Sequence, residues 1–383
     1  MSEYQYYEFL AIDRPLTSEE ISELRALSTR AHITPVSFTN EYNWGSFSGD
    51  PDKLMQLYFD AHVYVANWMS AIFKVRVPIE ALSETTIKAM SDFYIPDFTA
   101  TKNHWIITWG LEESENYERF GMDDGREWMV RLAPIRDELL RGDIRSLYIG
   151  WLSAVTEEMA EDDDLEPMSI KGLGELTTAQ KALAEFLEVD KDLLAGAGIG
   201  SPAIQSGETS QNDIDEWISR LPQDEVTDIL RQLMAGKGQQ AERTLRNRFT
   251  AWQCRLKNGE PETPRRTIEE LWENAESAKK LRLEQDELEQ KQREMKRRKE
   301  REAHLKILSG NFPKAWKTVR QNIERGSGLA YDDACRALVD LSEAYSLYSS
   351  RKLFQQELEQ FMTEYMRRKA LIQRMVKAGI WGK

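Results

Sequence analysis

Residues 265–308 have the sequence RRTIEELWENAESAKKLRLEQDELEQKQREMKRRKEREAHLKIL, which contains no Gly and no Pro. The stretch consists largely of Glu, Lys, Arg, Gln, Leu and Ala, which are strong helix formers. One continuous helix of this length would extend over about 65 Å, more than the width of a small domain. We therefore expect a long helix that separates an acidic, aromatic-rich N-terminal part from a helical C-terminal part.

The apolar residues of this stretch indicate that only its first half packs on a neighbour. Four apolar side chains near its start have the 3, 4, 3 spacing of a packing seam, namely Ile268, Leu271, Ala275 and Ala278. Leu281, Leu288 and Met295 then recur every seven residues, out of phase with that seam. A helix of this kind either bridges two domains or forms a coiled-coil dimer, and the sequence favours the bridge.

Charge divides the chain at the same place. Residues 265–383 hold 26 Lys and Arg against 19 Asp and Glu, a net charge of +7, whereas residues 1–264 have a net charge of −21. The two parts should attract each other, within one molecule or between molecules, over a Debye length of about 8 Å. The alternative is that most of these charges are solvated surface.

Short apolar segments in the first 160 residues predict an α+β domain. We expect strands at residues 4–12, 32–42, 73–77 and 104–111, and helices at residues 124–140 and 144–159. Two further helices are expected between the strands. This order favours a mixed sheet with helices on one face, loosely similar to a ferredoxin-like fold.

Capping signals define the starts of those two helices. Thr17 is followed by Glu20 at the spacing of a capping box. Asp50 precedes Pro51, which suits the first position of a helix. We expect the second helix to continue through Trp68, because its apolar side chains resemble one buried helical face.

The rest of the chain is expected to be helical and interrupted by linkers. Residues 157–166 hold seven carboxylates but lack the ligand spacing of a calcium loop, so they predict a solvated acidic turn. The Gly-rich residues 195–202 predict a hinge and not a dinucleotide fingerprint, since no strand precedes them. We divide the chain into an α+β domain at 1–160, a linker with a short helix at 161–212, a helical segment at 213–258, the long helix at 265–308 and a bundle of three helices at 311–383.

The cysteine content and the length of the apolar runs indicate the cellular compartment of the protein. Cys254 and Cys335 are the only cysteines, too few for a disulfide framework or a zinc site, which suits a reducing cytosol. The N-terminal residues lack the features of a signal peptide. The longest uncharged, mostly apolar run, residues 61–73, is shorter than the about 20 residues of a membrane span. We expect a cytoplasmic protein with no membrane association.

No motif nominates a catalytic, metal or cofactor site, and the sequence favours a protein that is not an enzyme. The four histidines include no pair at the spacing of zinc ligands, and no P-loop is present. Asp60 and His62 lie two apart on an expected helix and so would not share a face. A hydrolase stays an alternative in which His32, His62 or His104 meets carboxylates in a pocket.

Residues 291–301 carry a net charge of +5. The seven cations are Lys291, Arg293, Lys296, Arg297, Arg298, Lys299 and Arg301. Clustered cations bind phosphate backbones, but these side chains surround the helix and no aromatic residues are interleaved to stack bases. They are candidate contacts to nucleic acid or to an acidic protein surface.

Trp44 and Phe47 are candidate partner contacts. They lie in a turn beside Gly45 and Gly49. A turn with two large apolar side chains is either tucked under its domain or exposed for a partner. The sequence leaves both options open.

Whole segments of the chain resemble a family of uncharacterised bacterial proteins. The blocks YQYYEFLAIDRPLT, LRALSTRAHITPVSFTNEYNWGSF and GDPDKLMQLYFDAHVYVANW look like the start of its members, and GELTTAQKALAEFL and YDDACRALVDL are similar to later segments. Members are often encoded near SWIM zinc-finger proteins, so the resemblance implies a protein partner; it implies no activity and no catalytic residue. After Trp68 the chain departs from the family, with Met69, Ser70 and Ala71 where a Gly is expected.

These observations favour a cytoplasmic bacterial adaptor or scaffold that binds a protein partner. Nucleic-acid association through residues 291–301 is the first alternative, and the hydrolase with a dispersed site is the second. Self-association through the long helix is compatible with the adaptor hypothesis.

Overall fold

The computed structural model describes residues 4–45, 47–93, 95–112, 114, 116, 119, 124–203, 211–236, 238, 241–242, 245–246, 248–249, 252 and 264–382. The chain forms two compact units, Met1–Leu281 and Arg282–Lys383. An α+β N-terminal part and a helical C-terminal half with one long helix are both present, as the sequence predicts.

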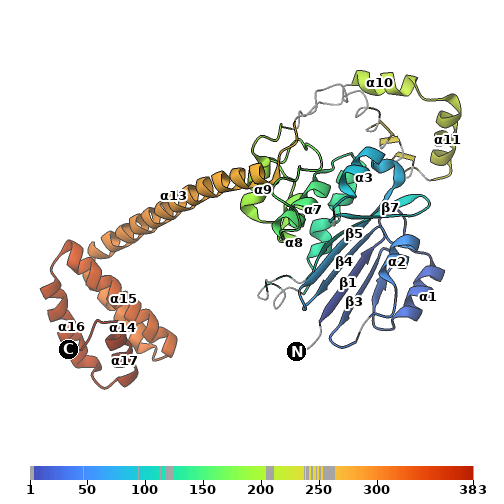
Figure 1. Cartoon of the computed structure of the whole chain (residues 1–383). Helices are drawn as coiled ribbons and strands as arrows, with labels where there is room; N and C mark the ends of the chain where they lie inside the picture. Colours follow the sequence, from blue (N-terminus) through green and yellow to red (C-terminus); the bar gives the residue numbers. More distant parts are fainter. Residues whose placement is uncertain are drawn as a thin grey trace. The chain divides into compact units, whose positions relative to one another are not determined.

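The first unit is built on a seven-stranded sheet whose order is β2-β3-β1-β4-β5-β7-β6 (Figure 1). The strands are β1 (Gln5–Leu10), β2 (His32–Thr34), β3 (Ser37–Tyr42), β4 (Ala61–Ala66), β5 (Ser70–Pro78), β6 (Asp97–Ala100) and β7 (His104–Leu111). Each neighbouring pair is antiparallel, so the sheet is not mixed and its order is not ferredoxin-like. Short turns join β2 to β3, β4 to β5 and β6 to β7, and turns of this length permit only antiparallel pairing.

Strand β4 is the largest departure from the sequence-based expectation. The helix that begins at Pro51 ends at Leu57, and residues 61–66 form a strand in place of the expected helix. Nearly every residue of β4 is buried, because both faces of the sheet are covered. A strand buried on both faces has a continuous apolar run, which periodicity does not separate from a buried helix.

Helices surround the sheet, and their bounds follow the capping signals where these exist. They are α1 (Ser18–Leu27), α2 (Pro51–Leu57), α3 (Glu84–Met90), α5 (Trp128–Leu132), α6 (Pro134–Leu140), α7 (Arg145–Thr156), α8 (Thr178–Phe186), α9 (Lys191–Gly198), α10 (Gln211–Ser219) and α11 (Gln223–Met234). The capping box of Thr17 and Glu20 and the Asp50 cap are confirmed. Pro134 divides the expected helix 124–140, because α6 begins there as a new helix.

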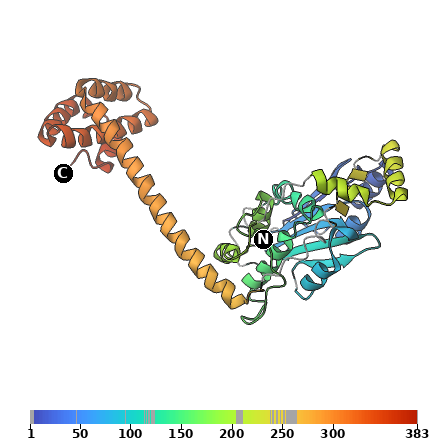
Figure 2. The ribbon, with the colours of Figure 1, turned by 90° about the horizontal axis from the view of Figure 1, so that it is seen from above.

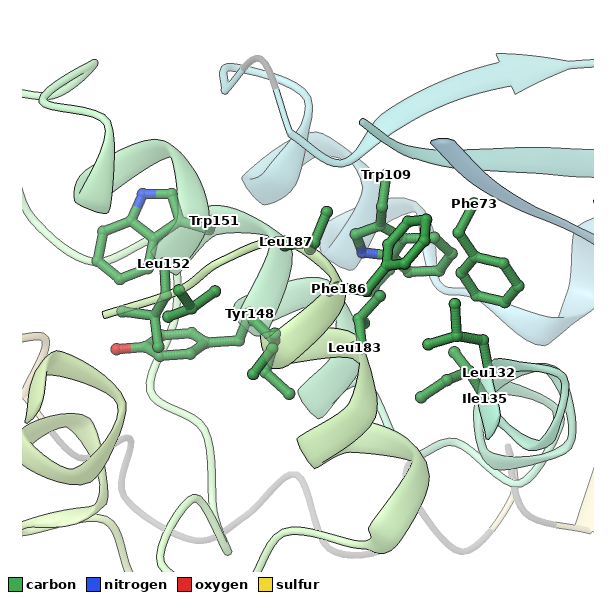
Figure 3. Close-up of a cluster of buried hydrophobic side chains, with 14 of the residues drawn as sticks. Phe73, Trp109, Leu132, Ile135, Tyr148, Trp151, Leu152, Leu183, Phe186 and Leu187 are labelled. Carbon is green, nitrogen blue, oxygen red and sulfur yellow. The ribbon is translucent and has the colours of Figure 1, made fainter. Parts of the chain in front are cut away.

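Both faces of the sheet are covered, not one. On one face, the segments with α1 and α2 enclose a cluster that includes Phe9, Phe38 and Phe59. On the other face, α5 to α9 pack against β4, β5 and β7. Figure 3 shows Phe73 and Trp109 of the sheet near Leu183 and Phe186 of α8.

Many side chains between residues 170 and 197 are buried in the core on this second face, so this part of the expected linker does not form a linker. Leu193 is fully buried, and residues 195–198 end α9 instead of opening a hinge. A Cβ atom on Gly196 would lie 2.5 Å from the backbone N of Ala275, so glycine permits the close contact between α9 and the start of the long helix. The remainder of the expected linker, residues 204–210, lies outside the described residues.

Helix α13 (Ile268–Ser309) is continuous over 42 residues, as Figures 1 and 2 show. Ile268, Leu271 and Ala275 are buried in the core of the first unit, which confirms the packing seam. Every residue from 283 to 300 is exposed. The polar second half of the helix therefore lies in water, as its composition predicts.

A buried carboxylate fixes the start of α13. Glu166, expected in a solvated acidic turn, is buried and accepts hydrogen bonds from the Tyr148 hydroxyl (2.6 Å) and from the backbone N (3.0 Å) and Nη2 (2.9 Å) of Arg266. Arg266 Nη1 also donates to the carbonyl oxygens of Ala197 and Ile199. The end of the acidic segment is thus part of the core.

We expect Arg266→Met to loosen the docking of α13 on the first unit by about 2 kcal/mol. The change leaves Glu166 buried without its cation, and the value is below that of a fully buried pair because Arg266 is partly exposed. Hydrogen exchange of the amides at residues 271–275 measures the opening. Arg265→Met is the control, because Arg265 is exposed. Equal exchange in the two variants would contradict the prediction.

The second unit is a bundle of four helices and not of three. They are α14 (Phe312–Glu324), α15 (Gly328–Tyr348), α16 (Arg351–Tyr365) and α17 (Lys369–Lys377). The expected third helix breaks near Arg368, whose Nη1 donates to the Ile323 carbonyl (2.6 Å) and to the Tyr331 hydroxyl (2.9 Å). These bonds hold the α16–α17 turn against α14 and α15.

The end of α13 belongs to this bundle. Leu305 is fully buried. Arg301 forms ion pairs with Asp340 and Glu343 of α15, at 2.5 Å each. The last turns of α13 are therefore a structural part of the second unit.

Candidate functional site

A groove of about 710 Å³ lies over the outer strands of the sheet. Its lining comprises Tyr6, Arg30, His32, Thr39, Asn40, Glu41, Asn43, Trp44 and Arg126. Tyr6 of β1 is paired with Glu41 of β3, and His32 of β2 is paired with Thr39 of β3. Directly paired residues present their side chains on the same face, so three adjacent strands form the floor.

One wall of the groove is fixed by residues 124–126. Arg126 Nη2 donates to Glu41 Oε2 at 2.6 Å, which neutralises that carboxylate. Gly125 has a φ of +79°, and a Cβ atom there would lie 2.7 Å from Cδ1 of Tyr6. Glycine therefore lets this loop lie directly against the Tyr6 ring.

Several polar side chains that line the groove are not paired with described residues. The side chains of Arg30, His32 and Asn43 form no hydrogen bond or ion pair with the described part of the chain. Trp44 is 74% exposed at the rim. The groove thus offers a flat apolar surface beside free hydrogen-bond donors.

Trp44 and Phe47 lie in different environments. Phe47 is buried, with its ring centroid 5.2 Å from that of Tyr7 and 5.7 Å from that of Phe38. Gly49 has no side chain to collide with the Phe47 ring, which is 2.5 Å from the position of a Cβ atom. Of the two aromatic residues, only Trp44 is therefore placed to contact a partner.

The hydrolase hypothesis requires His32, His62 or His104 to meet carboxylates in a pocket, and it stays a prediction. His32 lines the groove together with Glu41, whose carboxylate is paired with Arg126. His32, His62 and His104 lie on β2, β4 and β7, and other strands separate each from the next. Neighbouring strands are about 4.8 Å apart, so no two of these side chains are adjacent across the sheet. Within the part of the chain that the structure describes, no three His, Cys, Asp or Glu side chains gather closely enough to hold a metal ion.

His62 is a core residue. Its ring stacks on Phe9 with a centroid separation of 3.9 Å. Nδ1 lies 3.0 Å from the carbonyl oxygen of Glu8, which only accepts, so Nδ1 carries the proton. Burial lowers the pKa of His62 to about 3, with a smaller contribution from the charge of Lys74. The imidazole is neutral at physiological pH.

Asp60 lies just before β4, not on a helix, and is the centre of a structural network. Its side chain is 1% exposed. Oδ2 accepts the backbone N–H groups of Ile12 (2.7 Å) and Asp13 (2.8 Å), and Oδ1 accepts Nη2 of Arg76 (2.9 Å). Arg136 of α6 lies 3.7 Å from Oδ1, and its Nε donates to the Arg76 carbonyl. The carboxylate therefore joins β1, β4, β5 and α6.

The basic segment 291–301 is partly neutralised within the chain. Four of its cations form ion pairs, which are Lys291–Glu287 (3.2 Å), Arg293–Glu289 (3.2 Å), Arg298–Glu302 (3.3 Å) and Arg301–Asp340 (2.5 Å). Lys296, Arg297 and Lys299 are exposed and form no ion pair with any described residue. Nucleic-acid binding stays a prediction, which a gel shift with these three residues reversed to Glu would test.

A second, shallow hollow of about 370 Å³ lies on the second unit. Cys335, Arg336 and Arg374 are among its lining residues. Burial raises the pKa of the Cys335 thiol, so the thiolate that reacts with electrophiles is disfavoured. Arg374 is already paired with Asp332 at 2.7 Å. This hollow therefore offers fewer uncommitted groups than the groove.

Comparisons with known proteins give no relative. No protein-family model matches the chain, and neither a curated protein nor a solved structure does. The resemblance to the bacterial family stays a prediction. In the described ranges, no helix combines the length and apolar character that crossing a bilayer requires.

Proposed function

We propose that the protein is a cytoplasmic bacterial adaptor whose first unit binds an extended segment of a partner protein in the groove over β1, β3 and β2. The observation that carries this proposal is the exposure of Trp44 at the rim of the groove. Tryptophan is among the residues that contribute most to protein–protein binding, and here it lies beside a groove with unpaired hydrogen-bond donors.

The uncommitted groups define the chemistry of the partner segment. Arg30, His32 and Asn43 supply hydrogen-bond donors, whereas Glu41 is already paired with Arg126. Carboxylates and backbone carbonyl groups are the matching acceptors. The groove therefore suits a segment with an acidic side chain beside an apolar one that covers Trp44.

The two-unit organisation supports an adaptor. The second unit has its own apolar core, and the exposed middle of α13 belongs to neither core. Two folded units on one continuous helix give the chain two separate surfaces for partners. The family resemblance suggests SWIM zinc-finger proteins as the class of partner for one of them.

We expect Trp44→Ala to weaken the partner complex about 30-fold or more, the effect of losing a central aromatic contact worth about 2 kcal/mol. Partners are first recovered from a native lysate with the full chain, and the dissociation constant of a purified partner is then measured by calorimetry. Trp68→Ala is the matched control, because Trp68 is also exposed but does not line the groove. Failure to recover a stoichiometric partner, or equal binding by both variants, would refute the proposal.

A further inference from the structure

Three apolar side chains repeat along the exposed part of α13. Leu281, Leu288 and Met295 lie at seven-residue intervals, and each is more than half exposed. None of them belongs to the apolar core of either unit. A seven-residue repeat keeps these side chains on one side of a helix, where they form a stripe suited to a second helix.

The stripe fits the heptad of a coiled coil. With the three apolar residues at d, the a positions are Ala278, Gln285 and Gln292. The stems of Gln side chains pack against Leu while their amides reach the rim of the seam. Such a seam gives modest affinity, so the flanking charges determine which partner and which direction it accepts.

The flanking charges oppose a parallel pair of identical helices. In a parallel dimer, Glu284 at g would face the partner's Glu289 at e, and Lys291 would face the partner's Lys296. Each contact would occur twice because of the two-fold symmetry. Both contacts join like charges, so parallel pairing is disfavoured.

One antiparallel register converts these charges to attraction. When Gln285 lies opposite the partner's Leu288, Glu284 faces the partner's Lys291, and Arg282 faces the partner's Glu289. If one helix is shifted by one heptad along the other, Lys291 faces the partner's Lys291 or, for the opposite shift, Glu284 faces the partner's Glu284. Both shifts place like charges together. The charge pattern therefore selects a single register. The ion pairs that Lys291 and Glu289 make within the helix, with Glu287 and Arg293, are exposed, so they can exchange for contacts across the dimer.

We propose that α13 binds α13 of a second copy of this chain as a short antiparallel coiled coil, in the register that places Gln285 opposite the partner's Leu288. The complementarity of Glu284 with Lys291 and of Arg282 with Glu289 identifies the occupant of the stripe as an identical helix. The inference is independent of the groove, which contributes no residue to it. Dimerisation gives the adaptor two copies of each binding surface, which raises its avidity for multivalent partners.

Sedimentation equilibrium of the full chain tests the association. We expect a reversible dimer of the 44.4 kDa chain. Leu288→Asp should abolish the dimer, whereas Leu283→Asp should keep it, because Leu283 is equally exposed but lies outside the seam at f. A wild-type chain that stays monomeric at all concentrations, or equal effects of the two substitutions, would overturn the proposal.

Charge reversal tests the direction. Glu284→Lys and Lys291→Glu should each weaken the dimer about tenfold, because each turns two attractive contacts into repulsive ones. The double variant restores both contacts and should recover most of the wild-type affinity. A tighter dimer from Glu284→Lys alone would indicate parallel pairing and would overturn the register.

Cross-linking tests the register directly, in chains with Cys254 and Cys335 replaced by Ala. A mixture of Leu281→Cys and Gln292→Cys chains should be joined by a short bis-maleimide, because these positions face each other across the antiparallel seam. Leu281→Cys chains alone should not cross-link, since their thiols would be eleven residues apart along the axis, about 16 Å. Cross-linking of Leu281→Cys alone, without the mixed product, would refute the antiparallel arrangement.

Discussion

Asp60→Ala should lower the free energy of unfolding of the first unit by about 5 kcal/mol. The carboxylate accepts two backbone N–H groups and pairs with Arg76, and Arg136 lies near it. Removing it leaves the Arg76 guanidinium in the interior without its counter-charge, and breaking one buried pair in this way costs about 3–5 kcal/mol. Arg136 loses a more distant carboxylate but keeps its ion pair with Asp13 at 2.8 Å. The loss of the acceptor for Ile12 and Asp13 adds to this cost.

Hydrogen exchange of the amides of β4 and β5 measures this loss, because a chain of two units does not guarantee a single two-state transition. Asp52→Ala is the matched control. Asp52 also pairs with a cation of β5, Lys74, but it is mostly exposed, so its loss should cost less than about 1 kcal/mol. Similar exchange in the two variants would show that the Asp60 network does not stabilise the sheet.

The second large effect is acid destabilisation through His62. The pKa of His62 is about 3 in the folded chain, well below the about 6.5 of an unfolded chain, because the ring is buried. Between these values the unfolded state binds a proton that the native state does not, so the free energy of unfolding falls as pH falls, by about 1.4 kcal/mol per pH unit. From pH 6.5, where the unfolded imidazole is already half protonated, to pH 4.5 the loss should be about 2 kcal/mol.

His62→Phe should remove most of this fall in the free energy of unfolding between pH 6.5 and pH 4.5, whatever the substitution does to stability at pH 7. Exchange of the β4 amides, measured at pH 4.5 and pH 6.5, gives the difference for the wild type and for the variant. His304→Ala is the control, because His304 is exposed on α13 and forms an ion pair with Asp340 on the surface. If the pH dependence persists in His62→Phe, or disappears in His304→Ala, then groups other than His62 cause the loss of stability at low pH.

The parts of the fold that the sequence predicts correctly are those with local causes. The Thr17 and Asp50 caps act within one helical turn, and residues 268–309 form a helix because the stretch has no competing preference. Strand β7 is recognisable from its β-branched and aromatic residues. In each case the determining contacts lie close together in the sequence.

The errors arise where distant segments determine the structure. Residues 61–66 resemble a buried helix because covering layers bury both faces of β4, and those layers come from elsewhere in the chain. Glu166 resembles its acidic neighbours, although Arg266, one hundred residues later, pairs with it. A single sequence contains no signal for either partner.

The candidate groove is predicted only in part, for the same reason. Trp44 stands out as a large apolar residue in a glycine-flanked turn, whereas Arg30, His32 and Arg126 have no distinguishing context. Antiparallel pairing of β1, β3 and β2 forms the floor with His32, and the loop at residues 124–126 brings Arg126 to Glu41 of β3. The basic segment of α13 shows the opposite case, because its cations are conspicuous in the sequence but four of the seven are neutralised by neighbours.

The contact of Gly196 with the backbone at Ala275 has an evolutionary consequence. Any other residue at 196 would place a carbon atom 2.5 Å from the nitrogen of Ala275, and no rotamer change relieves a collision with main chain. Replacing one Cα hydrogen atom of Gly196 by a methyl group is therefore enough to disrupt this contact. In a homologue with any other residue at position 196, the start of α13 would have to shift away from α9 to make room for the Cβ atom.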